Sequence, residues 1–347
     1  MNFLYKMKRK IKGILVVVGI LLQWIDEYNK GRYFMLKNQT SYLTFGAMMI
    51  ALFSILLAMS VYVPFVGFIT SFIVPLPIAW YSAKFERKQA SWVTIIGIII
   101  SFIIGGVFGV LFALIVAPLG FIIGDAIRNK KSKVYLLMAS GIFLLLMTAL
   151  QYIISIWVLN INVLEQLFES FEIYYDQVGN IMSSMGQLPK DYDEQVAQAI
   201  LIAKMIMPSY FIGGVFITAI IYLAINLSLL KRLKLEVPKF SKFKDFRLPK
   251  AVLWYYLIVS IFSLFATFEV GSFGYLASIN ALLILRALLF LQGVSLIHYY
   301  FHVLGYPKWL ALIVTILAVP LYTFTIIVGV FDLGFNLRSY LKGRYKK

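Results

Sequence analysis

The chain has 347 residues, of which 61% are hydrophobic and 14% charged, so an ordinary soluble domain is excluded and we expect an all-α, multi-pass protein of the cell membrane. In a soluble protein, the net charge of +17 would suggest binding to nucleic acid. Here the basic residues cluster between apolar runs and at both ends of the chain, as in the cytoplasmic loops of membrane proteins. We therefore expect no nucleic-acid partner. The absence of cysteine excludes disulfides, Cys metal sites and a thiol nucleophile.

Residues 1–36 differ from the rest of the chain. The basic segment YKMKRKIK precedes only about thirteen apolar residues, Gly13 to Ile25, which is too short for a comfortable membrane span. The run resembles the hydrophobic part of a signal peptide, although no cleavage site with small residues follows it. We interpret residues 1–36 as an N-terminal extension or weak anchor, with Met35 as an alternative start of translation.

Residues 37–231 contain apolar runs for six membrane spans, each of about 20 residues. The run from Ala90 to Gly124 would be roughly 52 Å long as one helix, which is too long for one span. Because basic segments flank it on both sides, we expect two short spans with a break at Gly105–Gly106. The other four predicted spans are Leu43–Val63, Phe65–Ala83 (broken by Pro75 and Pro77), Val134–Leu159 and Ala203–Leu230.

The segment 161–203 has seven acidic residues against a single Lys190, and we interpret it as external. Its apolar residues recur at helical spacing, with the acids largely on the other side, so we expect an amphipathic helix on the outer face. The sequence LPKDYDEQ then turns the chain back, with Asp191 or Asp193 as the expected N-cap of the next helix.

Residues 232–250 are predicted to form a basic cytoplasmic loop. The stretch 231–250 has eight Lys and Arg residues against two acids, which is the strongest indication of orientation in the chain. We expect this loop to contact the anionic headgroups of the bilayer, and a docking surface for a cytosolic partner is the alternative. The basic residues expected at this surface are Lys239, Lys242, Lys244 and Arg247.

Residues 251–347 are predicted to form about three further membrane helices and a basic tail. The expected helices are Ala251–Phe268, Phe273–Val303 and Trp309–Phe331. Three crossings from a cytoplasmic loop would leave the tail RSYLKGRYKK outside, against the positive-inside rule. Either Phe273–Val303 folds as a hairpin near Arg286, or the basic tail is an exception to the rule.

Arg286 stands in the middle of an apolar run, where a charged side chain costs at least roughly 2.5–3.5 kcal/mol. We therefore expect a buried polar group with a partner, and the available carboxylates near the ends of spans are Glu269 and Asp125. Arg286 is equally expected to form a structural ion pair or to contact a ligand. If Phe273–Val303 folds as a hairpin, Arg286 is only a turn residue.

His298 and His302, the only histidines, share one helix face in the sequence HYYFH. No catalytic Glu and no third ligand accompany them, so we expect no metal site. The motifs GxSxG and HExxH and the Walker loop are missing, and no pair of carboxylates lies within the predicted spans. We expect neither enzymatic activity nor a cofactor.

Ala47 and Ala51, in the sequence AMMIA, share one face of the first span and would let another backbone approach closely. Six helices with both ends in the cytoplasm, a broken middle and this A-x-x-x-A motif resemble the substrate-binding S components of energy-coupling-factor vitamin transporters. The resemblance implies that Ala47 and Ala51 dock onto a transmembrane coupling subunit that works with ATPases. An internal contact with another helix of the same chain is the alternative.

About residues 37–342 more specifically resemble the YybS-like membrane proteins of Gram-positive bacteria. The sequences that carry this resemblance are FRLPKAVLW (246–254), LQGVSLIHYYF (291–301) and GVFDLGFNLR (329–338). The long acidic external segment, the extra C-terminal spans and the short loop YVPFVG distinguish the chain from vitamin S components.

We therefore expect a transporter subunit of S-component type that binds an unknown small molecule and works with a separate ATPase module. The alternative is a membrane scaffold or regulatory protein that binds cytosolic or envelope factors through residues 231–250 and the acidic external helix.

Overall fold

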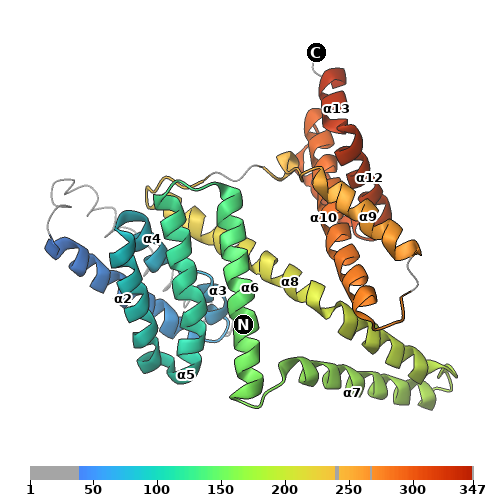
Figure 1. The fold of residues 1–347 in the computed structure, drawn as a ribbon, viewed down its shortest axis with the longest axis horizontal. Helices are drawn as coiled ribbons and strands as arrows, with labels where there is room; N and C mark the ends of the chain where they lie inside the picture. The colour runs from blue at the N-terminus through green and yellow to red at the C-terminus, as the bar shows by residue number, and fades with distance from the viewer. Residues whose placement is uncertain (1–38, 239–241, 266–267, 346–347) are drawn as a thin grey trace, which may run out of the picture. The chain divides into compact units, whose positions relative to one another are not determined.

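The computed structural model describes residues 39–238, 242–265 and 268–345, and every regular element in these residues is a helix (Figure 1). The chain forms two compact units, residues 1–162 with 215–239, and residues 163–214 with 240–347. The predicted extension 1–36 lies outside the described residues. The division of the chain at residues 36, 231 and 250 stays a prediction.

Six helices in the described residues are long and apolar enough to cross a membrane, and a bent pair near the C-terminus would add a seventh if it counts as one span. This confirms the prediction of a polytopic helical membrane protein. The helices of the first unit are α2 (Gln39–Tyr62), α3 (Val66–Ser71), α4 (Leu76–Lys84), α5 (Arg87–Arg128), α6 (Lys133–Trp157) and the second half of α8 (Tyr192–Arg232).

The second predicted span consists of the two short helices α3 and α4. Pro75 directly precedes α4 and Pro77 lies in its first turn, where proline is tolerated because the N–H groups there have no partner within the helix. Residues 76–82 of α4 are all buried. Gly120 and Gly124 of α5 allow this close packing, since a Cβ on Gly124 would overlap the carbonyl oxygen of Ala79.

Helix α5 breaks where the sequence predicts. Gly106 has φ 57° and ψ −144°, a conformation that glycine adopts without the steric penalty of a side chain. A Cβ on Gly109 would lie 2.5 Å from the carbonyl oxygen of Ser101, so the chain reverses between these two residues. The two halves of α5 therefore form a hairpin (Figure 1), which confirms the expected break at Gly105–Gly106. That each half is a short membrane span stays a prediction.

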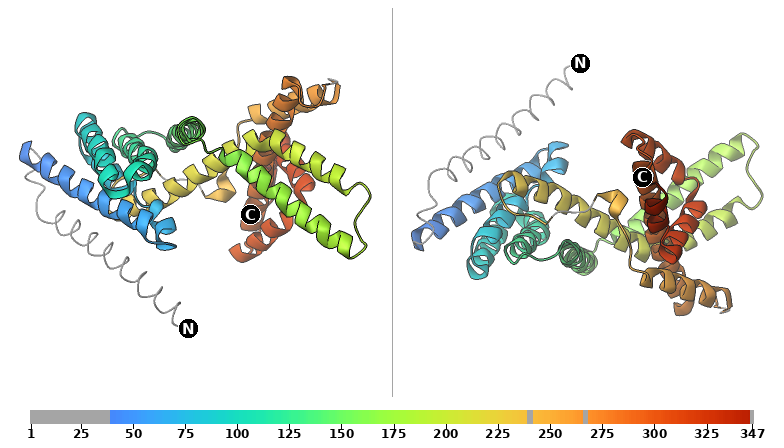
Figure 2. Two further views of the ribbon diagram at one scale, coloured as in Figure 1. Left: turned by 90° about the horizontal axis from the view of Figure 1, so that it is seen from below. Right: turned by 90° about the horizontal axis from the view of Figure 1, so that it is seen from above.

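In the second unit, the amphipathic helix predicted within residues 161–203 is α7, and it lies beside the first half of α8 in both figures (Figures 1 and 2). Asp191 directly precedes α8, and its carboxylate accepts a hydrogen bond from Nε2 of Gln195 at 2.6 Å. The elements of this unit are α7 (Val163–Ser184), the first half of α8, the short 3-10 helix η1 (Phe243–Asp245), α9 (Ala251–Phe265), α10 (Phe273–Val303), α11 (Lys308–Ala318), α12 (Tyr322–Phe335) and α13 (Leu337–Tyr345).

Helix α8 contains Pro208, and a side chain from α10 inserts at this point. Asn280 accepts a hydrogen bond from the backbone N–H of Ser209 at 3.1 Å and donates one to the carbonyl oxygen of Met205 at 2.8 Å. A regular helix would pair these two backbone groups with each other. The Asn280 amide therefore satisfies the backbone where the proline disturbs it, and it fixes α8 to α10.

Helix α10 is continuous over its 31 residues, so the alternative of a hairpin near Arg286 is wrong. The expected last span is instead broken, because α11 and α12 meet at an angle of 113° around Pro320. Helix α12 packs closely on α10, where a Cβ on Gly329 would overlap the carbonyl oxygen of Leu289. A core of Leu289, Ile326 and Leu333 lies in this contact.

Candidate functional site

Four features predicted from the sequence can be located in the two units, and the first is the pair Ala47 and Ala51. Both alanines lie on the exposed side of α2, whereas Met49 and Phe53 on the other side are fully buried. The described helices of the first unit therefore leave these two alanines uncovered. The choice between an internal contact and a docking face stays a prediction.

The second feature is the basic loop, which is held by a buried cluster of polar side chains that we call the polar cluster (Asp332, Arg338, Gln292 and Ser295). Nε of Arg338 donates to Oδ2 of Asp332 at 3.0 Å, and Nε2 of Gln292 donates to the same oxygen at 2.5 Å. Asp332 is fully buried and the Arg338 side chain is only 9% exposed. The ion pair is therefore shielded from water, which strengthens it but makes the loss of either partner costly.

The polar cluster binds the loop mainly through backbone groups. Arg338 donates from Nη1 to the carbonyl oxygen of Lys244 at 2.7 Å and from Nη2 to Oγ of Ser295 at 3.0 Å. Oγ of Ser295 lies 2.7 Å from the carbonyl oxygen of Phe243, and Oε1 of Gln292 accepts from the N–H of Leu248 at 2.9 Å. The loop between η1 and α9 is thereby fixed to α10 and to the start of α13.

The expected surface residues of this loop have different environments. Lys242 and Arg247 are exposed, and Arg247 also donates to the side chain of Asn336, which ends α12 in the left-handed conformation (φ 51°) that asparagine tolerates. Lys244 is partly buried and forms an ion pair of 3.2 Å with its neighbour Asp245. Lys239 lies outside the described residues.

Sequence reasoning missed Asp332, Arg338, Gln292 and Ser295 as a group. Apart from the pair Arg338–Asp332, their contacts join residues 40 to 94 positions apart, and helical periodicity carries no information about such pairings. One signal was present. After Asp245 the chain has only two acidic residues, Glu269 and Asp332, and Asp332 is the one inside an apolar run. A carboxylate inside the membrane is costly without a partner, and the cation Arg338 follows Asp332 six residues later.

The third feature is Arg286 with its two candidate partners. Arg286 is exposed, and it forms no ion pair with a carboxylate among the described residues. Asp125 pairs instead with Arg128 at 2.6 Å, one turn further along α5. Glu269 is exposed in the turn before α10. Within the second unit, Arg286 and Glu269 form no ion pair, and in the first unit Asp125 is bound by Arg128.

The fourth feature is the pair of histidines. Nε2 of His298 lies 2.7 Å from Oγ1 of Thr315, so this ring binds α10 to α11. The centre of the ring is also 5.3 Å from that of Phe243, with the two planes perpendicular. Throughout the part of the chain that the structure describes, no group of three or more potential metal ligands comes together.

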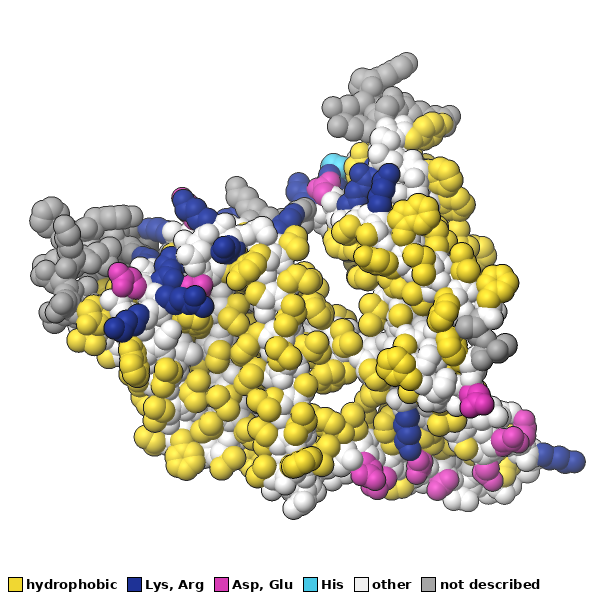
Figure 3. Space-filling model, in the orientation of Figure 1, with side chains coloured by type: hydrophobic (Ala, Val, Ile, Leu, Met, Phe, Trp, Pro, Cys, Tyr) yellow, Lys and Arg dark blue, Asp and Glu magenta, His cyan; other side chains and the backbone are white. Residues whose placement is uncertain are grey.

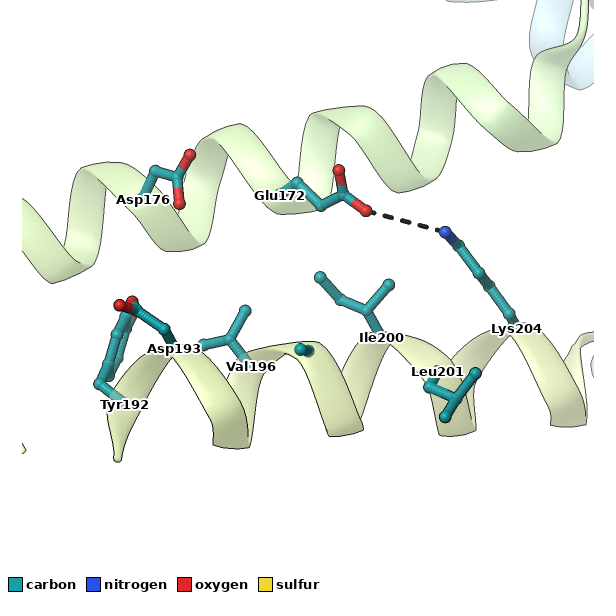
Figure 4. A pocket seen from close by; sticks show the side chains of 9 residues that line it. Glu172, Asp176, Tyr192, Asp193, Val196, Ile200, Leu201 and Lys204 are labelled. Carbon is teal, nitrogen blue, oxygen red and sulfur yellow. Dashed lines mark ion pairs between the residues drawn. The ribbon is translucent and has the colours of Figure 1, made fainter. Parts of the chain in front are cut away.

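A groove of about 440 Å³ lies between α7 and α8, and acidic side chains gather around it (Figures 3 and 4). Glu172 and Asp176 line the groove from α7, and Lys204 of α8 forms an ion pair of 3.7 Å with Glu172. Tyr192 closes one end by donating from its hydroxyl group to the carbonyl oxygen of Tyr175 at 2.8 Å. Because both members of the ion pair are half exposed, the pair contributes little stability.

Comparisons with known proteins match most of the chain. A family model described as "Predicted membrane protein (DUF2232)" matches residues 51–333, which include Arg286, Gln292 and Asp332. The "Uncharacterized protein YybS" of Bacillus subtilis (strain 168) is 30% identical over 311 residues, which cover 88% of this chain and 100% of that protein. No solved structure gives a significant match. The resemblance to YybS-like proteins is thus confirmed, and the chain belongs to the DUF2232 family of predicted membrane proteins.

Proposed function

We propose that this protein is a small-molecule-binding membrane subunit of S-component type, which passes its substrate inward together with a separate coupling subunit and ATPase module. The observation that carries the proposal is the exposure of Ala47 and Ala51 on α2. Helices in lipid associate through close packing of their backbones, and small side chains make that approach possible. An uncovered pair of small residues on the first helix is what a docking surface for another membrane helix requires.

The architecture of the first unit supports the same proposal. Helix α2 contributes Phe45, Met49, Phe53 and Leu57 to the core, so its bulky residues stabilise the unit itself. Its other side is left with short side chains at positions 47 and 51. The sequence also resembles S components in the broken middle of the six predicted spans. The proposal assigns no catalytic activity to the chain.

The test is substitution with bulky residues in the variant Ala47→Leu/Ala51→Leu. We expect this protein to remain folded, with an unfolding temperature close to that of the wild type, and to lose co-purification of a membrane coupling subunit and its ATPases. The matched control is Ala224→Leu, which adds the same bulk at an exposed alanine of α8 in the same unit. A folded double variant that still retains every partner of the wild type would contradict the docking function.

The small molecule is sought separately. Mass spectrometry of metabolites released from the detergent-purified protein should identify a compound that is enriched over the same preparation of an unrelated membrane protein. Because this ligand binds the isolated subunit, the double variant should retain it.

A scaffold function is the second candidate, and the fixed conformation of residues 242–248 favours it. The polar cluster holds the backbone of this loop while Lys242 and Arg247 stay exposed, so the basic surface keeps one shape. A rigid surface binds a partner at lower entropic cost than a mobile loop does. Neutralising Lys239, Lys242, Lys244 and Arg247 together should then release a cytosolic partner without affecting partners that depend on Ala47 and Ala51.

A further inference from the structure

Arg286 lies deep in the apolar part of α10, between two polar anchors. Six residues before it, Asn280 is bonded to α8 at Met205 and Ser209. Six residues after it, Gln292 is bonded to the backbone of the basic loop at Leu248. Each interval is roughly 9 Å at 1.5 Å per residue. Since the basic loop marks one membrane surface, Arg286 stands inside the hydrocarbon region, where an unpaired charge costs roughly 2.5–3.5 kcal/mol or more.

Within the described residues, the second unit provides no anion for Arg286. Asp332 is already bound by Arg338 and Gln292, and Glu269 lies in the turn before α10, four residues before its start. Arg286 forms no ion pair with either of them. The side chain is also exposed, so its charge is neither neutralised nor enclosed by this part of the protein.

The side chain of Tyr322 lies near the guanidinium of Arg286. The ring of Tyr322, at the start of α12, lies 5.2 Å from that of Phe290, which is one turn after Arg286 on α10. Tyr322 interacts electrostatically with Arg286, and it also interacts with Tyr210 of α8 and Tyr256 of α9. A phenolic O–H group donates hydrogen bonds, so Tyr322 places one potential donor near the unpaired cation.

The pair α11–α12 brings a non-helical segment to the same place. Helix α11 starts five residues after α10 ends, and Arg338, just after α12, lies 5.5 Å from the ring of Tyr299 near that same end of α10. The start of α11 and the end of α12 are therefore at one membrane surface. The bend between these helices at Pro320 is next to Tyr322 and lies inside the membrane. Exposed backbone at such a depth is tolerated only against protein, water or another polar group.

We propose that Arg286 is an anion-binding site inside the membrane and that its ligand is the phosphate group of an amphiphilic lipid. A guanidinium binds phosphate through two parallel N–H···O bonds, and the remaining phosphate oxygens accept hydrogen bonds from hydroxyl groups. Because Arg286 is exposed in an apolar segment of α10, the ligand enters from the bilayer, with its acyl chains along the apolar helix. This site is separate from the face formed by Ala47 and Ala51, and it does not depend on a coupling subunit.

The test uses the full-length protein purified in a neutral detergent and three probes: dioctanoyl phosphatidic acid, dioctanoylglycerol and inorganic phosphate. Phosphatidic acid should raise the unfolding temperature of the wild type in a saturable manner, whereas dioctanoylglycerol, which lacks the phosphate, should not. In Arg286→Gln the apparent Kd for phosphatidic acid should weaken about tenfold or more, as expected for the loss of charge-assisted hydrogen bonds. Arg286→Lys, which keeps the charge, should retain part of the binding.

The control is Lys250→Gln, which removes an exposed cation at the end of the basic loop and should bind phosphatidic acid as the wild type does. Equal binding by Arg286→Gln and the wild type, or no binding by the wild type, would overturn the site. Saturable stabilisation by inorganic phosphate alone, lost in Arg286→Gln, would overturn the lipid as the source of the phosphate. If Arg286→Gln does not fold, the wild type and Arg286→Lys are compared by native mass spectrometry. The measured quantity is the number of phospholipids that each protein retains. We expect a lower number for Arg286→Lys.

Discussion

Arg338 and Asp332 form an ion pair of 3.0 Å that joins the start of α13 to α12, with both side chains almost completely shielded from solvent. The same guanidinium holds the carbonyl oxygen of Lys244, and the same carboxylate accepts from Gln292. The pair therefore links the basic loop, α10 and the C-terminal helices. Because each charge is buried with the other as its counter-charge, the structure depends on both.

The first prediction follows from this dependence. Asp332→Asn keeps the volume of the side chain but leaves the Arg338 charge buried without a counter-charge. We expect a loss of about 3–5 kcal/mol in the free energy of unfolding, measured by thermal or denaturant unfolding in detergent. The double variant Asp332→Asn/Arg338→Gln should lose less than the sum of the two single variants, because no unpaired charge remains.

The control for this experiment is Lys204→Gln. Lys204 and Glu172 also form an ion pair, but they are 3.7 Å apart and half exposed, so the change should cost no more than about 1 kcal/mol. Equal stabilities of Asp332→Asn and Lys204→Gln would show that burial does not decide the strength of these pairs.

The second prediction concerns the packing of α5 on α4. Gly124→Ala should destabilise the first unit by about 1–3 kcal/mol, because the added Cβ would overlap the carbonyl oxygen of Ala79. The matched change is Gly213→Ala, where no atom lies within 4 Å of the added Cβ. There the gain in helix propensity should leave the stability unchanged or raise it by up to about 1 kcal/mol. The unfolding temperature of Gly124→Ala should therefore fall, and that of Gly213→Ala should stay unchanged or rise.

The third prediction concerns the side chain that inserts into α8. Asn280→Leu should leave the N–H of Ser209 and the carbonyl oxygen of Met205 without their present partner, at a cost of about 1–3 kcal/mol. Ser228→Ala is the matched control, because its hydroxyl group is exposed and bonds only within α8, to the carbonyl oxygen of Ala224. If both variants unfold like the wild type, Asn280 does not support the helix at Pro208.

Much of the fold could be predicted because local composition and length decide it. The break in α5 follows from an apolar run too long for one span, with two glycines in its middle and basic residues at both ends. Helix α7 follows from the spacing of apolar residues among acids. Both predictions concern a single segment and its surroundings, where periodicity and charge are sufficient.

Contacts between distant segments could not be predicted in this way. The contact of Asp332 with Gln292 depends on the close packing of α10 and α12 at Gly293 and Gly329, which no pattern of one helix reveals. The break between α11 and α12 had a local signal in Pro320, within the run that was interpreted as one span. That signal was outweighed by the apolar length of the run, although a proline inside an apolar segment commonly ends or kinks a helix.

The last prediction concerns the orientation of the C-terminal tail. Arg338 donates to the carbonyl oxygen of Lys244 at 2.7 Å, so the start of the tail and the basic loop share one membrane surface. If α9 and α10 each cross and the pair α11–α12 returns to the surface where it began, the tail is cytoplasmic and the positive-inside rule holds throughout this part of the chain. The three crossings considered from the sequence then become two crossings and one re-entrant hairpin.

The natural chain has no cysteine, so single cysteines report their own location without further changes. Lys242→Cys and Ser339→Cys, both at exposed positions, should react with a membrane-impermeant maleimide only after the cells are opened. Ser183→Cys, near the end of the acidic helix α7, should react in intact cells. Labelling of Ser339→Cys in intact cells together with Ser183→Cys would mean that α11 and α12 form one broken span. In that case the bond between Arg338 and Lys244 could not exist in the membrane, since its two ends would lie on opposite sides.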